Sequence, residues 1–265
     1  MTKRDIKFLD SLDLIGILFH PRKNQGNVAQ TEEKFSLAFE VDKNIRLGGR
    51  FYRTHLYETA PNLLFFHGNG EIATDYDNIA PMYQNLGINL SVIDFRGYGE
   101  STGTPTFSSL LTDVYEIFPQ FSEFLGDNGF GGSVSVMGRS LGSGPALELA
   151  NHFQKDLQCL ILESGFANTY SLLRRLGISN IRSHSDKAEA ISALPIIREI
   201  KIPLLVIHGE RDLIVPLEEG IALYQNAGSK RKEILIIPSA GHNDLLYWGR
   251  DDYMAAISGI IRDKR

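Results

Sequence analysis

The chain has 265 residues, enough for one large α/β domain, and its 43% hydrophobic and 22% charged content is that of an ordinary globular protein. Its formal charge of −5, from 27 basic and 32 acidic side chains, gives no indication of a nucleic-acid partner. Cys159 is the one cysteine, which excludes an intramolecular disulfide and a cysteine-based metal site. The composition fits a reducing compartment, and we expect a cytoplasmic location.

Residues 1–33 are expected to form an arm or helix that packs on the main domain. The stretch 6–19 is rich in apolar residues, but Asp10 and Asp13 interrupt it and no small-residue cleavage site follows. It therefore predicts neither a secretory signal nor a membrane span, which needs roughly 20 apolar residues. The alternative is an arm that docks on a membrane or a partner, although nothing in the sequence supports even transient membrane contact.

Strand-like runs alternate with helical patterns along the rest of the chain. Strands are expected at about 34–41, 47–54, 62–67, 89–94, 133–137, 158–162, 204–208 and 233–237, the first two as an antiparallel hairpin. Helices are expected at about 72–86, 108–125, 141–154, 187–199, 217–227 and 249–263. The alternation predicts a single α/β domain over 34–265, with a mostly parallel eight-stranded sheet and helices on both faces. The interval 165–203 predicts a short helical cap.

A serine between two glycines follows the strand at 133–137, in the run Gly138-Arg139-Ser140-Leu141-Gly142. Ligands bind beyond the carboxyl ends of strands in parallel α/β sheets, and a sharp strand-to-helix turn exposes a serine hydroxyl there. The two glycines remove side chains that would collide in such a turn. Ser140 is therefore predicted to be a nucleophile, the alternative being a structural serine in a tight turn. Arg139 is expected to point into the neighbouring loops.

An acid and a base follow two later strands. Asp212 comes directly after the strand at 204–208, where an aspartate could orient a histidine and stabilise its charged form. Glu163, at the end of the strand before it, is the competing candidate for this acid. His242 follows the last strand on a loop of small residues, and an imidazole titrates near neutral pH. The order Ser140, Asp212, His242 is that of a hydrolase triad, and successive members are 72 and 30 positions apart.

The run His67-Gly68-Asn69-Gly70 after the strand at 62–67 has two interpretations. With Ala73 it matches a dinucleotide-binding fingerprint, and Asp94 ends the next strand, where a ribose-binding acid would lie. Alternatively, the backbone N–H groups of Asn69 and Leu141 form an oxyanion hole. The first interpretation leaves the serine, aspartate and histidine without a role, so we favour the second.

Five motifs in this order resemble the α/β-hydrolase superfamily: HGNG at 67–70, DFRGYGES at 94–101, GRSLGSG at 138–144, HGERD at 208–212 and GH at 241–242. LFHPR at 18–22 and the minimal cap resemble the branch that contains protein depalmitoylases and related membrane-associated serine hydrolases. Members that act at membranes often carry an acylated N-terminal cysteine cluster or an anchor, which this sequence lacks, so membrane residence is not carried over.

The resemblance implies that Ser140 is the nucleophile, His242 the general base and acid, Asp212 the orienting acid, and Asn69 and Leu141 the oxyanion hole. It implies no metal ion and no organic cofactor. The expected reaction is hydrolysis of a carboxylic ester or thioester on a small molecule or an acylated protein, through an acyl-enzyme. A peptidase or amidase and a catalytically silent binding protein are the alternatives. Apolar residues of the cap are expected to contact the acyl group, although they could instead pack on the sheet; they are Phe166, Leu172, Leu173 and Leu176.

Overall fold

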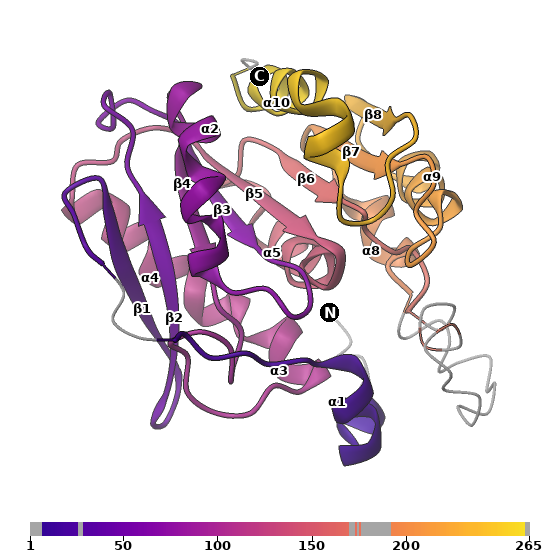
Figure 1. Cartoon of the computed structure of the whole chain (residues 1–265), viewed down its shortest axis with the longest axis horizontal. Coiled ribbons are helices and arrows are strands. Elements are labelled where there is room, and N and C mark those ends of the chain that lie inside the picture. The colour runs from indigo at the N-terminus through magenta and orange to yellow at the C-terminus, as the bar shows by residue number, and fades with distance from the viewer. Residues whose placement is uncertain (1–6, 26–28, 170–172, 174, 176–191, 263–265) are drawn as a thin grey trace.

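The computed structural model describes residues 7–25, 29–169, 173, 175 and 192–262. Within this part of the chain eight strands form one sheet in the order β1-β2-β4-β3-β5-β6-β7-β8, shown in Figure 1. β1 pairs with β2 and β2 with β4 in antiparallel fashion, and every later pairing is parallel. The predicted mostly parallel eight-stranded sheet is confirmed. The strands are β1 (Lys34–Asp42), β2 (Ile45–Tyr52), β3 (Asn62–Phe66), β4 (Asn89–Ile93), β5 (Val134–Arg139), β6 (Leu160–Glu163), β7 (Leu204–Gly209) and β8 (Lys232–Ile237).

The described helices follow the predicted pattern, with differences at breaks and ends. Pro81 lies in the first turn of a new helix and divides the predicted helix 72–86 in two, because proline cannot continue the hydrogen bonding of a preceding helix. Within the predicted helix 187–199, residues 187–191 lie outside the described residues, and the described helix runs from Leu194 to Glu199. The last helix begins at Leu245 and is interrupted at Gly249, whose backbone is not helical, so its second segment begins about where a helix was predicted. The helices are η1 (Lys7–Asp10), α1 (Leu12–Leu18), η2 (Ala73–Asn78), α2 (Ala80–Asn85), α3 (Phe107–Thr112), α4 (Val114–Asp127), η3 (Ser140–Gly142), α5 (Ser143–Phe153), α8 (Leu194–Glu199), α9 (Leu217–Asn226) and α10 (Leu245–Arg262).

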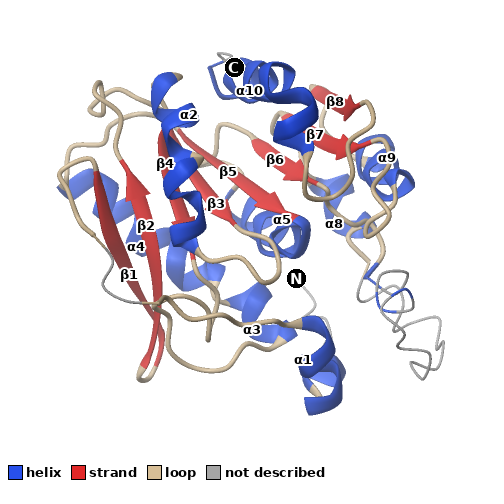
Figure 2. Cartoon of the chain, viewed as in Figure 1, coloured by secondary structure: helices blue, strands red, loops and turns tan. Residues whose placement is uncertain are grey.

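Helices cover both faces of the sheet (Figures 1 and 2). Successive side chains of a strand point to opposite faces, so each central strand contributes to two cores. Val136 of β5 packs in the core beneath α3, α4, α5, α8 and α9, whereas Met137 packs in the core beneath α2 and α10. Both side chains are fully buried. This two-sided burial explains why the central strands are predominantly hydrophobic.

The segment before β1 packs along the carboxyl edge of the sheet. Leu9, Leu18 and Phe19 are buried in the core, and Lys23 forms an isolated bridge with Gly99. The N–H of His20 donates to the side-chain oxygen of Asn69 at 3.0 Å. The N-terminal arm therefore contacts the loop that follows β3, next to the site described below.

The core beneath α2 and α10 contains four tyrosines whose pKa values are raised above the ordinary value of 10, chiefly by burial: Tyr52, Tyr76, Tyr83 and Tyr253. A raised pKa means that the unfolded chain ionises before the folded one does. Their contribution to stability is therefore complete below pH 10 and is lost as the pH rises above it. We expect the free energy of unfolding to fall steeply above pH 10, with tyrosinate absorbance from these rings appearing only as the protein unfolds. An early, non-cooperative appearance of all tyrosinate absorbance in folded protein would contradict this.

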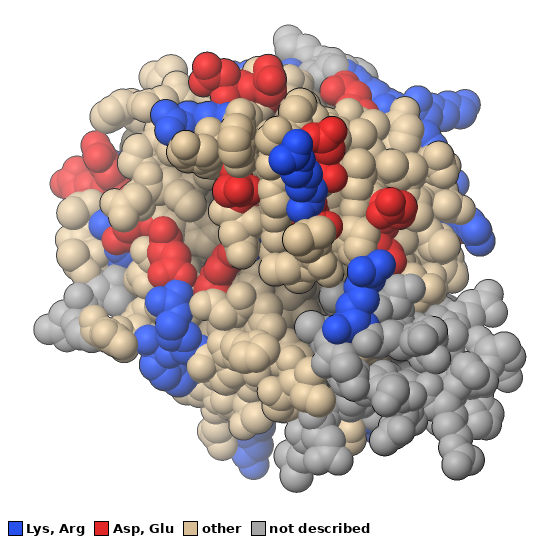
Figure 3. All heavy atoms as spheres, turned by 45° about the vertical axis from the view of Figure 1, so that its right-hand side comes forward, with Lys and Arg blue, Asp and Glu red and all other residues tan. Residues whose placement is uncertain are grey.

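No helix in the described ranges is both long enough and apolar enough to cross a membrane. On the face shown in Figure 3, acidic and basic side chains are interspersed and do not gather in one basic patch.

Candidate active site

Ser140 lies on a strained turn between β5 and α5. Its φ is +50°, in the left-handed region that costs a non-glycine residue about 1–3 kcal/mol. The flanking glycines make the turn sterically accessible. A Cβ on Gly138 would lie 2.1 Å from the carbonyl oxygen of Gly142, and a Cβ on Gly142 would lie 2.1 Å from that of Phe66. The strand end, the turn and the first turn of helix thus pack too closely for a side chain at position 138 or 142.

Ser140, His242 and Asp212 form an unbroken series of hydrogen bonds. His242 Nε2 lies 2.9 Å from Ser140 Oγ, and His242 Nδ1 lies 2.7 Å from Asp212 Oδ2. Ser140 follows β5, Asp212 follows β7 and His242 follows β8. His242 is 102 positions from Ser140 and 30 from Asp212, so only the folded sheet brings the three together. In this arrangement the imidazole can accept the serine proton while the carboxylate holds its other nitrogen.

The carboxylate of Asp212 is fully buried and fully bonded. Its Oδ1 accepts the backbone N–H groups of Ile214 at 3.0 Å and Val215 at 2.8 Å. Burial alone would raise the pKa of Asp212, but the hydrogen bond and charge of His242 and the Val215 N–H outweigh it, and the pKa lies below its ordinary value. The aspartate therefore stays ionised at neutral pH, the state needed beside a developing imidazolium.

Asn69 and Leu141 line the same pocket as Ser140 and His242. The side chain of Asn69 is not free to move. Its Oδ1 accepts from the hydroxyl of Tyr98 at 2.7 Å, and its Nδ2 donates to the carbonyl oxygen of Leu18 at 2.9 Å. These bonds fix the loop after β3, so its main chain is held beside the serine without contribution from a substrate.

This pocket has a volume of about 230 Å³. Apart from the serine, histidine and Asn69, its wall consists of Arg139, Asn243 and four aliphatic side chains: Leu18, Leu141, Ile214 and Val215. Leu213 beside it is 89% exposed and Ile214 is 47% exposed. The mouth is therefore largely apolar and open to solvent.

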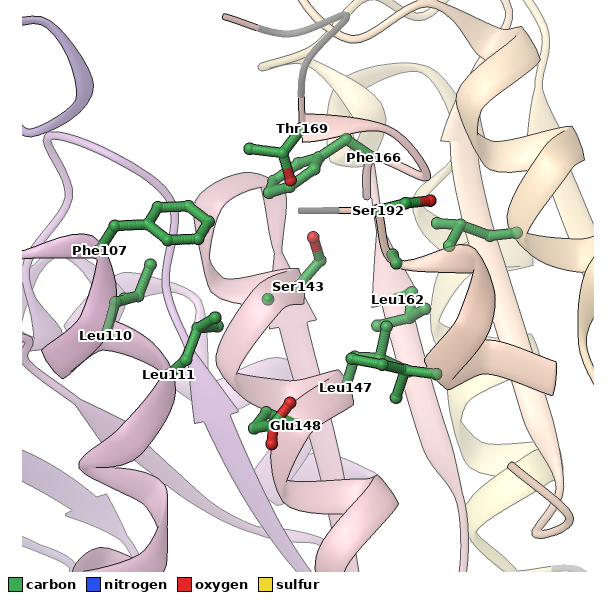
Figure 4. Close-up of a pocket in the computed structure, with 14 residues that line it drawn as sticks. Phe107, Leu110, Leu111, Ser143, Leu147, Glu148, Leu162, Phe166, Thr169 and Ser192 are labelled. Carbon is green, nitrogen blue, oxygen red and sulfur yellow. The ribbon is translucent and has the colours of Figure 1, made fainter. Parts of the chain in front are cut away.

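A second, apolar cleft begins at Ser143, one helical turn after the nucleophile (Figure 4). Phe107, Leu110 and Leu111 of α3 form one wall in that view, and Phe166 and Thr169 lie across its top. The cleft is narrow, with space for about one water molecule (about 30 Å³).

The four predicted substrate contacts have different outcomes. Phe166 lines the apolar cleft. Leu173 is fully buried in the hydrophobic core, and its contact with substrate stays a prediction. Leu172 and Leu176 lie outside the described residues, as does most of the predicted cap.

Asp94 as a ribose-binding acid and Glu163 as the acid of the triad are both disfavoured, because each carboxylate is hydrogen-bonded elsewhere. Asp94, the ribose-binding candidate, is 2% exposed and accepts the N–H of Ala73 at 2.8 Å, while Gly99 packs directly against its carboxylate. Glu163, the other acid candidate, accepts from Arg139 at 2.9 Å and from Tyr253 at 2.6 Å. Both carboxylates thus stabilise the surrounding loops instead of facing a ligand or His242.

Two contributors to the site were missed at the level of sequence: Leu18, which comes from the N-terminal arm, and Glu71, which holds the loop after β3. Arg139 points into the neighbouring loops, as expected from the sequence, and binds the loop that carries His242. In the described part of the chain, no group of three or more His, Cys, Asp or Glu residues is placed to hold a metal ion.

Comparison with known proteins agrees with this arrangement. A family model described as "Serine aminopeptidase, S33" matches residues 58–182 and 188–246. Protein bem46 of Schizosaccharomyces pombe is 31% identical over 213 residues, which cover 78% of this chain and 69% of that protein. The lysophosphatidylserine lipase ABHD12 of Rattus norvegicus is 29% identical over 74% of this chain but only 53% of its own length. The chain thus spans about half to two thirds of the curated relatives that it matches.

Among solved structures, esterase Pf2001 of Pyrococcus furiosus superimposes with a TM-score of 0.72 at 19% identity, covering 91% of this chain and 98% of that one. Est1E of Butyrivibrio proteoclasticus gives 0.67 at 15% identity, covering 85% and 97%. These likenesses show the fold. Together with the family match, they establish that this chain belongs to the α/β-hydrolase superfamily, within the family described as serine aminopeptidase S33.

Proposed function

We propose that this chain is a serine hydrolase that cleaves a carboxylic ester or thioester through an acyl-enzyme intermediate. The observation that carries the proposal is the series of hydrogen bonds from Ser140 through His242 to Asp212 at the open pocket. His242 takes the serine proton as Oγ attacks the acyl carbonyl, and the N–H groups of Asn69 and Leu141 stabilise the oxyanion. His242 then gives this proton to the departing alcohol or thiol. Water, activated by the same histidine, releases the acid and restores Ser140.

The leaving group decides between an esterase and a peptidase. An aminopeptidase must bind the charged amino terminus of its substrate, for which a carboxylate is the natural partner. Among the described residues that line the pocket around Ser140, none is acidic, and Glu148 of the neighbouring cleft accepts a hydrogen bond from the hydroxyl of Tyr115. One of the relatives is named as a lipase, and one of the structural neighbours is named as an esterase. We therefore favour an ester or thioester of an apolar acyl group, such as a lipid ester, over an amide.

We propose that the apolar cleft beyond Ser143 widens to receive the acyl chain, because its free space in the structure, about that of one water molecule, is too small for a long chain. Its wall combines leucine and phenylalanine side chains from α3, α5 and the segment after β6. Leu111, at its half-buried edge, is the position where a larger side chain would close it with the least disturbance of the core.

The proposal includes a cytoplasmic location, which rests on the single cysteine alone.

The test is kcat/KM across matched oxyesters and thioesters of increasing acyl length. We expect a maximum at long chains, which Leu111→Trp shifts to shorter ones. Leu56→Trp, at a site that is 77% exposed and far along the chain from the cleft, is the matched control and should leave the profile unchanged. A maximum at two to four carbons that neither variant moves would remove the acyl role of the cleft. Turnover of acyl amides but not of esters would favour the peptidase.

A further inference from the structure

The guanidinium of Arg139 binds four groups from three separate segments. Its Nε donates to Glu163 at 2.9 Å, and its Nη1 donates to the carboxylate of Glu71. Its Nη2 donates to the carbonyl oxygen of His242 at 2.9 Å and to the side chain of Asn243 at 2.8 Å. The side chain is only 12% exposed. The residue directly before the nucleophile thus contacts the main chain of the proposed general base.

The two carboxylates that hold Arg139 are themselves fixed on their far sides. Tyr76 donates to Glu71 at 2.7 Å, and Tyr253 donates to Glu163 at 2.6 Å. Burial alone would lower the pKa of Arg139, but the charges of Glu163 and Glu71 outweigh it and raise the pKa above its ordinary value. The cluster is therefore a permanently charged, fully bonded unit behind the triad.

The same cluster reaches the loop that carries Asn69. Glu71 accepts the backbone N–H of Gly68 at 2.8 Å. A Cβ at Gly68 would lie only 2.5 Å from Arg139 Nη1 and 3.0 Å from a carboxylate oxygen of Glu71. The first glycine of the HGNG motif, Gly68, therefore leaves the space that the guanidinium of Arg139 occupies.

We infer that Arg139 is a positioning residue for the hydrolytic reaction: its guanidinium sets the loops of His242 and Asn69 in place relative to Ser140. This inference rests on the proposed function. A displacement of about 1 Å in such an arrangement can cost about 10²-fold in rate. The planar fork of arginine makes all four bonds at once, whereas the point charge of lysine has three donors and a different geometry.

The test is Arg139→Lys, with kcat, KM and the rates of acylation and deacylation measured separately. We expect kcat to fall by about 10²-fold with KM changed less than about twofold, because lysine keeps a long, positively charged side chain at this position of the pocket wall. Acylation and deacylation should slow by similar factors, since both steps use His242 and the oxyanion hole. A role in packing alone would change Tm but not these rates.

Arg96→Lys is the matched control. Arg96 is also largely buried and binds the carboxylate of Asp113 through two nitrogens, at 2.8 and 2.6 Å, but contacts no triad residue. It should lose thermal stability as Arg139→Lys does while keeping kcat. Equal losses of Tm in the two variants with kcat unchanged in both would overturn the inference.

Glu71→Gln is the second variant, for use if Arg139→Lys does not fold. The amide oxygen still accepts the Gly68 N–H, but the charge beside Arg139 is lost, and we expect kcat to fall by about tenfold. Wild-type kcat in this variant would count against the inference. The proposed function is judged separately, because it fails only if wild-type protein neither turns over acyl substrates nor is acylated at Ser140.

Discussion

Replacing Ser140 with alanine is expected to lower kcat by about 10⁶-fold, as the loss of a serine nucleophile does in other hydrolases of this kind. The hydroxyl lies 2.9 Å from His242 Nε2 and is the group that would attack the acyl carbonyl. Alanine retains a Cβ at the same positive φ, so the strain of the turn is unchanged and Tm should stay close to that of the wild type.

Ser164→Ala is the matched control for this change. Ser164 also has a positive φ, of +46°, and is fully buried, and its hydroxyl has no hydrogen-bond partner in the structure. Removal of the Ser164 hydroxyl should leave kcat within about twofold of the wild-type value, because a hydroxyl without a partner loses no hydrogen bond when it is removed. If Ser140→Ala hydrolysed the substrate with a kcat close to that of the wild type, Ser140 would not be the nucleophile.

Asp212→Asn is expected to lower kcat by about 10⁴-fold. The amide has nearly the same shape, but it cannot stabilise the imidazolium and it favours the wrong tautomer of His242, whose Nδ1 lies 2.7 Å from the carboxylate. The two backbone N–H groups that Asp212 accepts can still be bonded by the amide oxygen, so the loop should remain folded. Steady-state kinetics and Tm together separate the loss of chemistry from a loss of structure.

Glu163→Gln distinguishes the two acids. Glu163 is bonded to Arg139 and Tyr253 and not to the histidine, so its variant should be impaired far less than Asp212→Asn. The reverse order of effects would assign the orienting role to Glu163.

The sheet could be predicted because its central strands are continuous apolar runs, and the triad because each member directly follows one of them. Ser140, Asp212 and His242 are each marked locally, by glycines or by a strand end, and the parallel sheet then places all strand ends at one edge. Element boundaries were less accurate where a local residue ended a helix, as before Pro81.

The remainder of the site depends on contacts between distant segments. Nothing in the sequence near Leu18 indicates that its carbonyl oxygen accepts from Asn69, 51 residues away. Glu71 and Arg139 are 68 residues apart, and neither has a neighbouring pattern that predicts an ion pair. The burial of Leu173 depends on such contacts too: the sequence marks it only as apolar, and tertiary packing buries it completely.

The most direct test of the central claim is to label the protein with a fluorophosphonate and to locate the adduct by mass spectrometry of its peptides. Such a probe reacts with a serine only where a base activates the hydroxyl. We expect one adduct per chain, on Ser140, which forms in the wild-type protein, forms much more slowly in Asp212→Asn and is absent from Ser140→Ala. An unlabelled wild-type protein, or an adduct on another residue that persists in Ser140→Ala, would contradict it.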